Sequence, residues 1–273
     1  MNVNDLRDSQ KQPVSDIMST LQSIEINPSE MCNRSCVFCP RTDPSLYKNK
    51  KEFIKLSTCE TIAQQLIEIN YTGRIGLVGF GEPTLHPQII DCIRILRKTS
   101  ANWIEINTNG DFLTRQLVES LSAAGCTHIG ISLYDSDLTK EFDRMVEGIN
   151  ITIVYRHHYN ASDNYNLNLV NRIEITQGNT LLDINRPCYL PFYKMFIDWN
   201  GDYLLCDQDW ARYTGGQYNV DSTSIKDYWT DKVNQYRLPL ISGDRSVYSP
   251  CNRCDVNGVL RGKECFDLIA QTI

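Results

Sequence analysis

The sequence lacks the features that mark membrane, secreted and nucleic-acid-binding proteins. No apolar stretch approaches the roughly 20 residues that a membrane-spanning helix needs. The first sixteen residues are polar and have no apolar core, so they are not a secretory signal. No run of basic residues is present and the formal net charge is −6, which argues against a nucleic-acid partner. We therefore expect a cytoplasmic protein that binds neither membranes nor nucleic acids.

Cysteine, by contrast, is abundant, with eleven residues in a chain of 273. In a reducing compartment, cysteines at short spacing indicate metal binding or catalysis rather than disulfide bonds. One group lies near the N-terminus and another in the last third of the chain. These groups are Cys32, Cys36 and Cys39, then Cys188, Cys206, Cys251 and Cys254. Cys59, Cys92 and Cys126 fall in or beside predicted helices, and we expect them to be small core residues.

The region from residue 21 to residue 180 alternates β-type runs with amphipathic helical patterns. The predicted strands are 23–27, 74–80, 103–108, 128–133, 151–155 and 169–175, and the predicted helices are 61–70, 87–98, 113 to near 125, and 137–147. Such alternation favours a parallel sheet with right-handed crossovers, and six units are too few to close an eightfold barrel. The predicted fold class is α/β, a partial (β/α)6 barrel of the TIM type, with sites at the C-terminal ends of its strands.

The pattern changes after about residue 180. Two β-type runs, 196–199 and 202–205, flank Asn200-Gly201, which predicts a hairpin with a tight turn. Residues 224–237 have a helical pattern. The second cysteine group brackets these elements, so we expect a small C-terminal domain at 181–273. Residues 1–20 are expected to form a flexible polar leader, and the barrel is expected to span 21–180.

Cys32, Cys36 and Cys39 form a Cys-x3-Cys-x2-Cys motif in the loop that follows the first predicted strand. Three thiolates on one loop can bind three irons of a [4Fe–4S] cluster, because soft sulfur ligands suit this chemistry. The fourth iron then stays open to a small molecule that carries an amine and a carboxylate. Zinc would need a fourth Cys or His nearby, and none follows at zinc-finger spacing. Unrelated buried cysteines are the alternative interpretation.

This motif resembles that of the radical S-adenosylmethionine (SAM) superfamily, in which an aromatic residue precedes the last cysteine, as Phe38 does here. The resemblance extends to Gly79-Phe80-Gly81-Glu82-Pro83, which is similar to the family's Gly-Gly-Glu-Pro element that meets the amino group of SAM. A glycine such as Gly81 lets the backbone approach a ligand, and the carboxylate of Glu82 suits an ammonium group. The resemblance also makes Asn109 a candidate partner of the SAM ribose, with an ordinary Asn-Gly turn as the alternative. Ser132 is a further candidate SAM contact.

The resemblance implies two cofactors, a [4Fe–4S] cluster and SAM. In this family the reduced cluster passes an electron to bound SAM, which splits into methionine and a 5′-deoxyadenosyl radical. That radical takes a hydrogen atom from an unactivated carbon of the substrate, while the protein orients the substrate and excludes water. The resemblance further implies an electron donor such as flavodoxin or ferredoxin.

Cys188, Cys206, Cys251 and Cys254 offer four thiolates, which would complete a second, auxiliary [4Fe–4S] cluster and leave no iron open for SAM. Their arrangement around a hairpin and a helix resembles the twitch domain, a shortened relative of the SPASM domain. A structural zinc ion bound by four cysteines is the alternative. Cys265 is either a surplus thiol or a sign that a different set of four is used.

Within the twitch-domain branch, the sequence resembles radical SAM dehydrogenases of aminocyclitols over nearly the whole chain. The shared elements include Thr-Asn-Gly-Asp-Phe-Leu-Thr at 108–114 and Asn171-Arg172. The resemblance makes Arg172 a candidate catalytic residue near SAM and substrate, although two glycines that follow it in those enzymes are absent here. Removal of a hydrogen atom from a carbinol carbon leaves a reducing radical, and a nearby cluster can accept its electron. We therefore expect oxidation of an alcohol in a small polyhydroxylated substrate.

Three alternatives start from the same residues. An epimerase would return a hydrogen atom from a thiol, and Cys265 is the candidate donor. A peptide-modifying radical SAM enzyme is the second possibility. The third belongs to another class, a non-catalytic metal-binding or redox-sensing protein, which would produce no 5′-deoxyadenosine.

Overall fold

A computed structural model describes residues 11–36, 39–45, 47–134, 138–157, 186–254 and 261–273. Its centre is a seven-stranded sheet with the order β5-β4-β3-β2-β1-β6-β7, in which all neighbouring strands are parallel except β6 and β7. The strands are β1 (Ser23–Ile26), β2 (Arg74–Leu77), β3 (Trp103–Thr108), β4 (His128–Leu133), β5 (Thr152–His157), β6 (Lys194–Ile197) and β7 (Tyr203–Leu204). This is the α/β fold with a parallel sheet that the sequence predicts.

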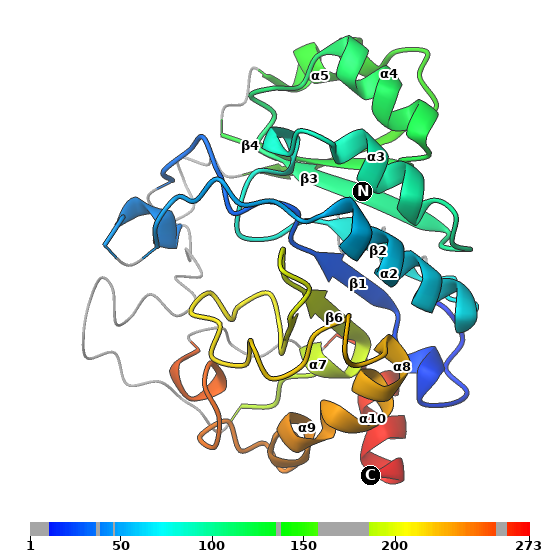
Figure 1. Ribbon diagram of the computed structural model, residues 1–273, viewed down its shortest axis with the longest axis vertical. Helices are drawn as coiled ribbons and strands as arrows, with labels where there is room; N and C mark the ends of the chain where they lie inside the picture. The colour runs from blue at the N-terminus through cyan, green and yellow to red at the C-terminus, as the bar shows by residue number, and fades with distance from the viewer. Residues whose placement is uncertain (1–10, 37–38, 46, 135–137, 158–185, 255–260) are drawn as a thin grey trace.

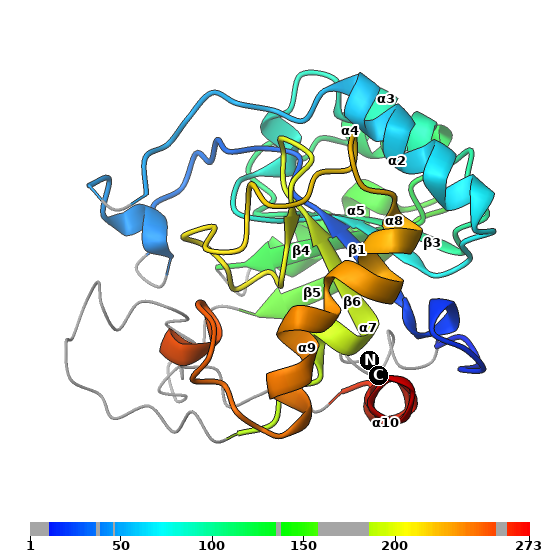
Figure 2. The same cartoon turned by 60° about the horizontal axis from the view of Figure 1, so that its bottom comes forward.

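Helices cover the sheet and close the core. The α-helices are α2 (Leu56–Glu68), α3 (Ile89–Leu96), α4 (Arg115–Ala124), α5 (Thr139–Val146), α7 (Leu190–Tyr193), α8 (Ile225–Asp227), α9 (Asn234–Ile241) and α10 (Lys263–Thr272). Short 3-10 turns are η1 (Met18–Thr20), η2 (Pro40–Thr42), η3 (Pro83–Leu85) and η6 (Cys251–Arg253), and η5 (Tyr228–Lys232) is a π-helical turn. In Figures 1 and 2, α2, α3 and α4 lie side by side along one face of the sheet, whereas α9 and α10 lie together near α7.

Local sequence accounts for these elements. Every residue of β1, β2 and β3 is buried, as expected for parallel strands that are covered on both faces. The helix α4 begins after Thr114, whose side chain accepts a hydrogen bond from the Leu117 N–H, and ends at Gly125 with φ of 99°, a left-handed conformation that glycine adopts without strain. Cys59, Cys92 and Cys126 are buried in the main core, which confirms the prediction for them.

The predicted boundaries of β3 and β4 agree with the structure, whereas the helix expected from Pro87 begins at Ile89. The predicted strand 169–175 lies outside the described residues. The predicted hairpin corresponds to β6 and β7, but β6 also pairs in parallel with β1. The central sheet therefore continues past residue 180, and the domain boundary placed there stays a prediction.

Among the described residues, no helix is both long enough and apolar enough to cross a bilayer.

Candidate active site

A cavity of about 290 Å3 lies at the C-terminal ends of the parallel strands. The loops after β1, β2, β3 and β4 contribute to it, together with β5 and the chain that follows β7. The residues that matter for its chemistry include Cys32, Cys36, Cys39, Gly81, Glu82, Asn107, Asn109, Ser132, Tyr134, Arg156, Asp207, Gln208 and Trp210. The cavity therefore collects most of the sequence-predicted site residues of the barrel. Phe38 and Arg172 lie outside the described residues.

The backbone of the cysteine loop is held by neighbouring side chains, which leaves the three thiols at the cavity. The Asn49 side chain accepts a hydrogen bond from the Cys32 N–H and donates one to the Cys32 carbonyl oxygen, both at 2.9 Å. The Thr42 hydroxyl lies 2.5 and 2.8 Å from the carbonyl oxygens of Cys36 and Cys39. Burial raises the pKa of Cys32 and of Cys39, because a buried thiolate loses its hydration.

The donor set of this loop fits an iron–sulfur cluster. Three soft sulfur donors from one loop line the cavity, and no fourth Cys or His lines it within the described residues. In the same part of the chain, no three Cys, His, Asp or Glu side chains are grouped tightly enough for a single metal ion. A cluster distributes its ligands over several irons, so it does not require that tight grouping.

Glu82 is buried, and only 3% of it is exposed. One carboxylate oxygen accepts hydrogen bonds from the Thr84 N–H at 3.0 Å and from the Thr108 hydroxyl at 2.7 Å, and the other accepts from the Asn109 N–H at 2.8 Å. Burial raises the pKa of Glu82, and these hydrogen bonds oppose the shift. Glu82 thus ties the end of β3 to the turn after β2, in addition to lining the cavity. Its role as partner of an ammonium group stays a prediction.

Asn107, rather than Asn109, offers unused polar atoms to the cavity. The Asn109 side chain donates to Asn33 at 2.8 Å and accepts from the Asp111 N–H at 3.0 Å, so it braces the cysteine loop. The side-chain oxygen and nitrogen of Asn107 are buried and have no hydrogen-bond partner within the described residues. A buried, unpaired amide is costly unless a ligand pairs with it. Asn107 therefore fits a polar ligand better than Asn109 does.

Arg156, on β5, was not singled out from the sequence. It lines the cavity, and its Nε is buried without a partner within the described residues. The available signal was its position near the C-terminal end of a predicted β run, but a lone arginine in a strand is not distinctive. Asp207 lines the same cavity, 2.6 Å from Lys194, which also contacts Glu25 of β1 at 2.9 Å. A hydrogen-bond donor and an acceptor thus both line one cavity.

The second cysteine group gathers around a separate small cavity. Cys188, Cys206, Cys251 and Cys254 all line it. Burial raises the pKa of Cys206 well above its usual range and that of Cys251 to about 12, because the thiols are shielded from water. Gln208 lines this cavity and also the first one. Cys265 lies elsewhere, in a third cavity beside residues that begin β1, β2 and β3.

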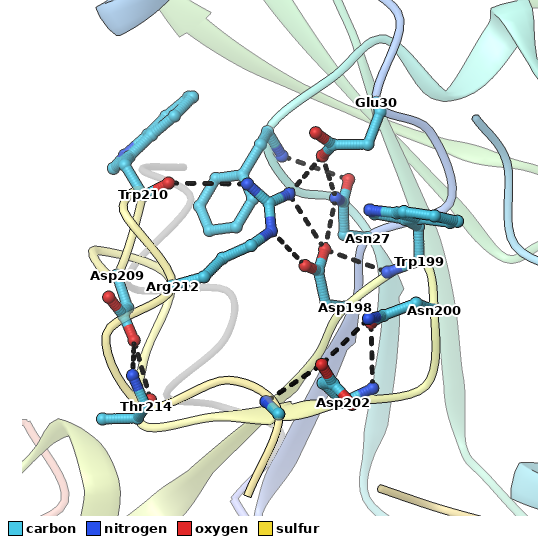
Figure 3. Close-up of polar contacts among 12 residues, drawn as sticks. Asn27, Glu30, Asp198, Trp199, Asn200, Asp202, Asp209, Trp210, Arg212 and Thr214 are labelled. Atoms are coloured by element: carbon cyan, nitrogen blue, oxygen red, sulfur yellow. Dashed lines mark hydrogen bonds and ion pairs between the residues drawn. The ribbon is translucent and has the colours of Figure 1, made fainter. Parts of the chain in front are cut away.

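A polar cluster joins the loop after β7 to the chain that precedes Cys32. Arg212 forms ion pairs with Glu30 and Asp198, and it donates to the Tyr47 hydroxyl at 2.9 Å. Figure 3 shows the Arg212 guanidinium between the two carboxylates, with Asn27 donating to Asp198 at 2.8 Å and to Glu30 at 3.1 Å. Because Glu30 is two residues from Cys32, this cluster fixes the two cysteine-bearing regions relative to each other.

Aromatic rings complete this connection. Phe80 occupies the place of the second glycine in the Gly-Gly-Glu-Pro element, and its ring lies 4.5 Å from that of Trp210 and 5.1 Å from that of Phe196. The larger side chain is therefore accommodated by packing against the C-terminal third of the chain. Trp210 and Phe80 together form an apolar part of the cavity wall.

Comparison with known proteins identifies the family. A model of the radical SAM superfamily matches residues 26–166, just over half of the chain. The chain belongs to the radical SAM superfamily. A second model, described as an iron–sulfur cluster-binding domain of the SPASM type, matches residues 188–255 of this radical SAM protein. Family membership implies a [4Fe–4S] cluster and SAM as cofactors, and the SPASM match implies auxiliary iron–sulfur binding.

Two curated relatives differ in how much they share. The S-adenosyl-L-methionine-dependent 2-deoxy-scyllo-inosamine dehydrogenase of Niallia circulans is 27% identical, over 90% of this chain and 97% of the relative. A probable GTP 3′,8-cyclase of Saccharolobus solfataricus is 30% identical, but the match covers 49% of this chain and 44% of that protein. The resemblance to the dehydrogenase therefore includes the C-terminal third of the chain.

Solved structures share the fold. BtrN in complex with AdoMet and 2-DOIA superimposes with a TM-score of 0.70 at 23% identity, covering 86% of this chain and 93% of that chain. Native anSMEcpe with bound AdoMet gives a TM-score of 0.55 at 14% identity, covering 92% and 97%.

Proposed function

We propose that this radical SAM protein is a dehydrogenase that oxidises a secondary alcohol of a small aminocyclitol- or sugar-like substrate to a ketone. The observation that carries the proposal is the position of Gln208, which lines both of the cysteine-lined cavities. The full-length resemblance to 2-deoxy-scyllo-inosamine dehydrogenase supports the same reaction.

Cys32, Cys36 and Cys39 would hold the SAM-cleaving cluster, and SAM bound to it would supply a 5′-deoxyadenosyl radical. Around it, the chain's own residues bind and orient. Gly81 can lie against a ligand because it has no side chain, and the unpaired amide of Asn107 would take a polar group of SAM. Glu82, Asn109 and Ser132 remain candidate SAM contacts, and Phe38 and Arg172 remain candidates from the resemblance.

The other walls of the cavity suit a hydroxylated ring. Arg156 would donate a hydrogen bond through its unpaired Nε, and Asp207 would accept one from a substrate hydroxyl. The aromatic wall of Phe80 and Trp210 offers an apolar surface to the C–H face of the ring. A substrate held on both sides would present one C–H bond and exclude water.

Loss of a hydrogen atom and a hydroxyl proton from a carbinol leaves one further electron to remove. Cys188, Cys206, Cys251 and Cys254 would hold an auxiliary cluster, which when bound would supply a one-electron acceptor. The short chain from Cys206 to Asp207 and Gln208 would keep the substrate hydroxyl close to that acceptor.

The position of Cys265 disfavours the epimerase alternative. An epimerase needs a hydrogen-atom donor at the substrate, and Cys265 lines the cavity near the strand starts instead. No other cysteine outside the two proposed ligand sets lines the substrate cavity within the described residues.

The test uses anaerobically reconstituted protein, SAM, a small reductant and 2-deoxy-scyllo-inosamine carrying deuterium at each carbinol carbon in turn. We expect deuterium in 5′-deoxyadenosine and one ketone per SAM cleaved. A Cys251→Ala/Cys254→Ala variant should still form 5′-deoxyadenosine but lose ketone at least tenfold, whereas a Cys32→Ala/Cys36→Ala/Cys39→Ala variant should form neither. A product that regains hydrogen at the labelled carbon would contradict dehydrogenation.

A further inference from the structure

A segment of lysines lies beside the loop that carries the first cysteine group. Residues 30–55 contain six basic and three acidic residues, whereas the whole chain has 27 basic and 33 acidic residues. Half of those basic residues are Lys48, Lys50 and Lys51, which we call the lysine segment. In Figure 1 the chain between β1 and α2 leaves the sheet as a long loop, and the cysteines and the lysine segment both belong to it.

The lysine segment is attached directly to the first cysteine. Asn49, in its middle, makes two hydrogen bonds of 2.9 Å to the backbone of Cys32. Asn49 also accepts a hydrogen bond of 3.0 Å from Arg41, whose guanidinium donates to the Glu30 and Phe80 carbonyl oxygens at 2.6 and 2.5 Å. Since consecutive Cα atoms are about 3.8 Å apart, the three lysines are held within a few residue lengths of Cys32.

The three lysines are available to a partner. All three are exposed, and none forms an ion pair with another residue in the described part of the chain. In the same loop, Arg34 and Asn33 bind Asp111, and Phe112, the residue after Asp111, is 45% exposed. Exposed positive charges therefore adjoin the cysteine loop, and a surface charge of one sign steers a partner of the opposite sign.

We propose that the lysine segment is the docking surface for a small acidic protein that carries one electron on a flavin or an iron–sulfur group. The inference rests on the proposed assignment of the SAM-cleaving cluster to Cys32, Cys36 and Cys39. Each cleavage of SAM consumes one electron. A partner must deliver this electron to the cluster, and the partner is thereby oxidised by one electron. The lysine segment is positive in a chain of net charge −6, so it selects an acidic carrier and orients it toward Cys32.

Charge complementarity of this kind mainly raises the rate at which the two proteins associate. Steering by a local charge cluster raises association rates by about 10- to 1,000-fold at low salt, and salt screens it with a Debye length of about 8 Å at physiological ionic strength. Reversal of the three charges should therefore slow reduction by a protein carrier at low salt, and added salt should diminish the difference.

The experiment compares Lys48→Glu/Lys50→Glu/Lys51→Glu with a control of equal charge change at exposed lysines elsewhere, Lys98→Glu/Lys140→Glu/Lys226→Glu. Reduced flavodoxin or ferredoxin supplies the electron in one series, and photoreduced 5-deazariboflavin in the other. We expect at least a tenfold loss of 5′-deoxyadenosine formation with the protein carriers in the lysine-segment variant alone, and no loss with the small reductant.

Binding is measured separately, by calorimetric titration of flavodoxin and ferredoxin into holoenzyme without SAM. We expect the lysine-segment variant to bind at least tenfold more weakly than the control variant. Equal losses in both variants, or unchanged binding, would overturn the docking surface. If the small reductant produces no 5′-deoxyadenosine in the unaltered protein, the cluster assignment fails, and the binding titration still decides whether the lysine segment docks a carrier.

Discussion

Replacement of Arg212 by methionine tests how strongly the two cysteine-bearing regions are joined. Arg212 is the cation for Glu30 and Asp198, whose side chains are only 2% and 1% exposed. In Arg212→Met these two carboxylates would remain buried near each other with hydrogen bonds from Asn27 but without a cation (Figure 3). Methionine keeps much of the aliphatic volume of the arginine side chain, so the expected decrease in the free energy of unfolding is mainly electrostatic.

The expected cost follows from the burial of the carboxylates. Removal of one partner from a buried ion pair costs about 3–5 kcal/mol, because the remaining charge is desolvated and uncompensated. The Arg212 side chain is itself 26% exposed, so water can partly replace it. We therefore expect the free energy of unfolding to fall by about 3 kcal/mol. The exposed pair of Arg94 and Asp91 provides the contrast, since Arg94→Met should cost less than about 0.5 kcal/mol.

The measurement is urea unfolding of the cluster-free protein under reducing, anaerobic conditions, followed by tryptophan fluorescence and circular dichroism. Arg212→Lys keeps the charge but loses the forked geometry of the guanidinium, so it should lower the free energy of unfolding less than Arg212→Met does. Glu30→Gln/Asp198→Asn combined with Arg212→Met should recover part of the loss, because the unpaired charges are removed. A loss below about 1 kcal/mol, or no recovery in the triple variant, would refute the reasoning.

Three further predictions concern packing, pH and metal content. In Gly81→Ala, the new Cβ would lie 2.0 Å from the Ser29 carbonyl oxygen, so the backbone must shift, and we expect at least tenfold weaker SAM binding by calorimetry. Gly243→Ala meets no atom within 4 Å; its φ of 78° strains the backbone, but Gly243 does not line the cavity, so SAM binding should be unchanged. Burial lowers the pKa of His128 to about 4 from an unfolded value of about 6.5, so the unfolded state binds more protons as the pH falls between these values, and the folded state becomes less stable. At pH 5 the free energy of unfolding, measured with urea, should be about 1–2 kcal/mol lower than at pH 7. His128→Phe keeps a ring against Trp103 and should remove this pH dependence. A Cys32→Ala/Cys36→Ala/Cys39→Ala variant should retain about half of the iron and sulfide, and a variant that binds only zinc or no metal would contradict two clusters.

The two amides at the end of β3 illustrate why a motif alone does not show which side chain already has partners within the protein. Asn107 and Asn109 are both amides in one short segment, and the resemblance to the family favours Asn109. In the folded chain, Asn109 is hydrogen-bonded to Asn33 and to the Asp111 N–H, whereas the side-chain oxygen and nitrogen of Asn107 have no partner among the residues that the structure describes. The choice depends on hydrogen-bond partners that are distant in sequence, such as Asn33.

Local patterns in the sequence determined much of this protein. The β-type patterns of β3 and β4 located both strands to the residue, because isoleucines at alternate positions (Ile104 and Ile106, Ile129 and Ile131) give the period of two that is typical of a strand. The spacing of Cys32, Cys36 and Cys39 after a strand indicated the family without any tertiary information, since three ligands of one cluster can come from a single loop.

Only the tertiary structure decided how the C-terminal third joins the barrel. β6 pairs with β1, and Arg212 contacts Glu30, although each of these pairs is more than 150 positions apart in the sequence. Gln208 lines two cavities that are built from different elements. Periodicity reports which face of an element is buried, but not which distant element covers it. Those partners are selected by packing and charge pairing in the folded chain, and that selection places Gln208 at both cysteine-lined cavities.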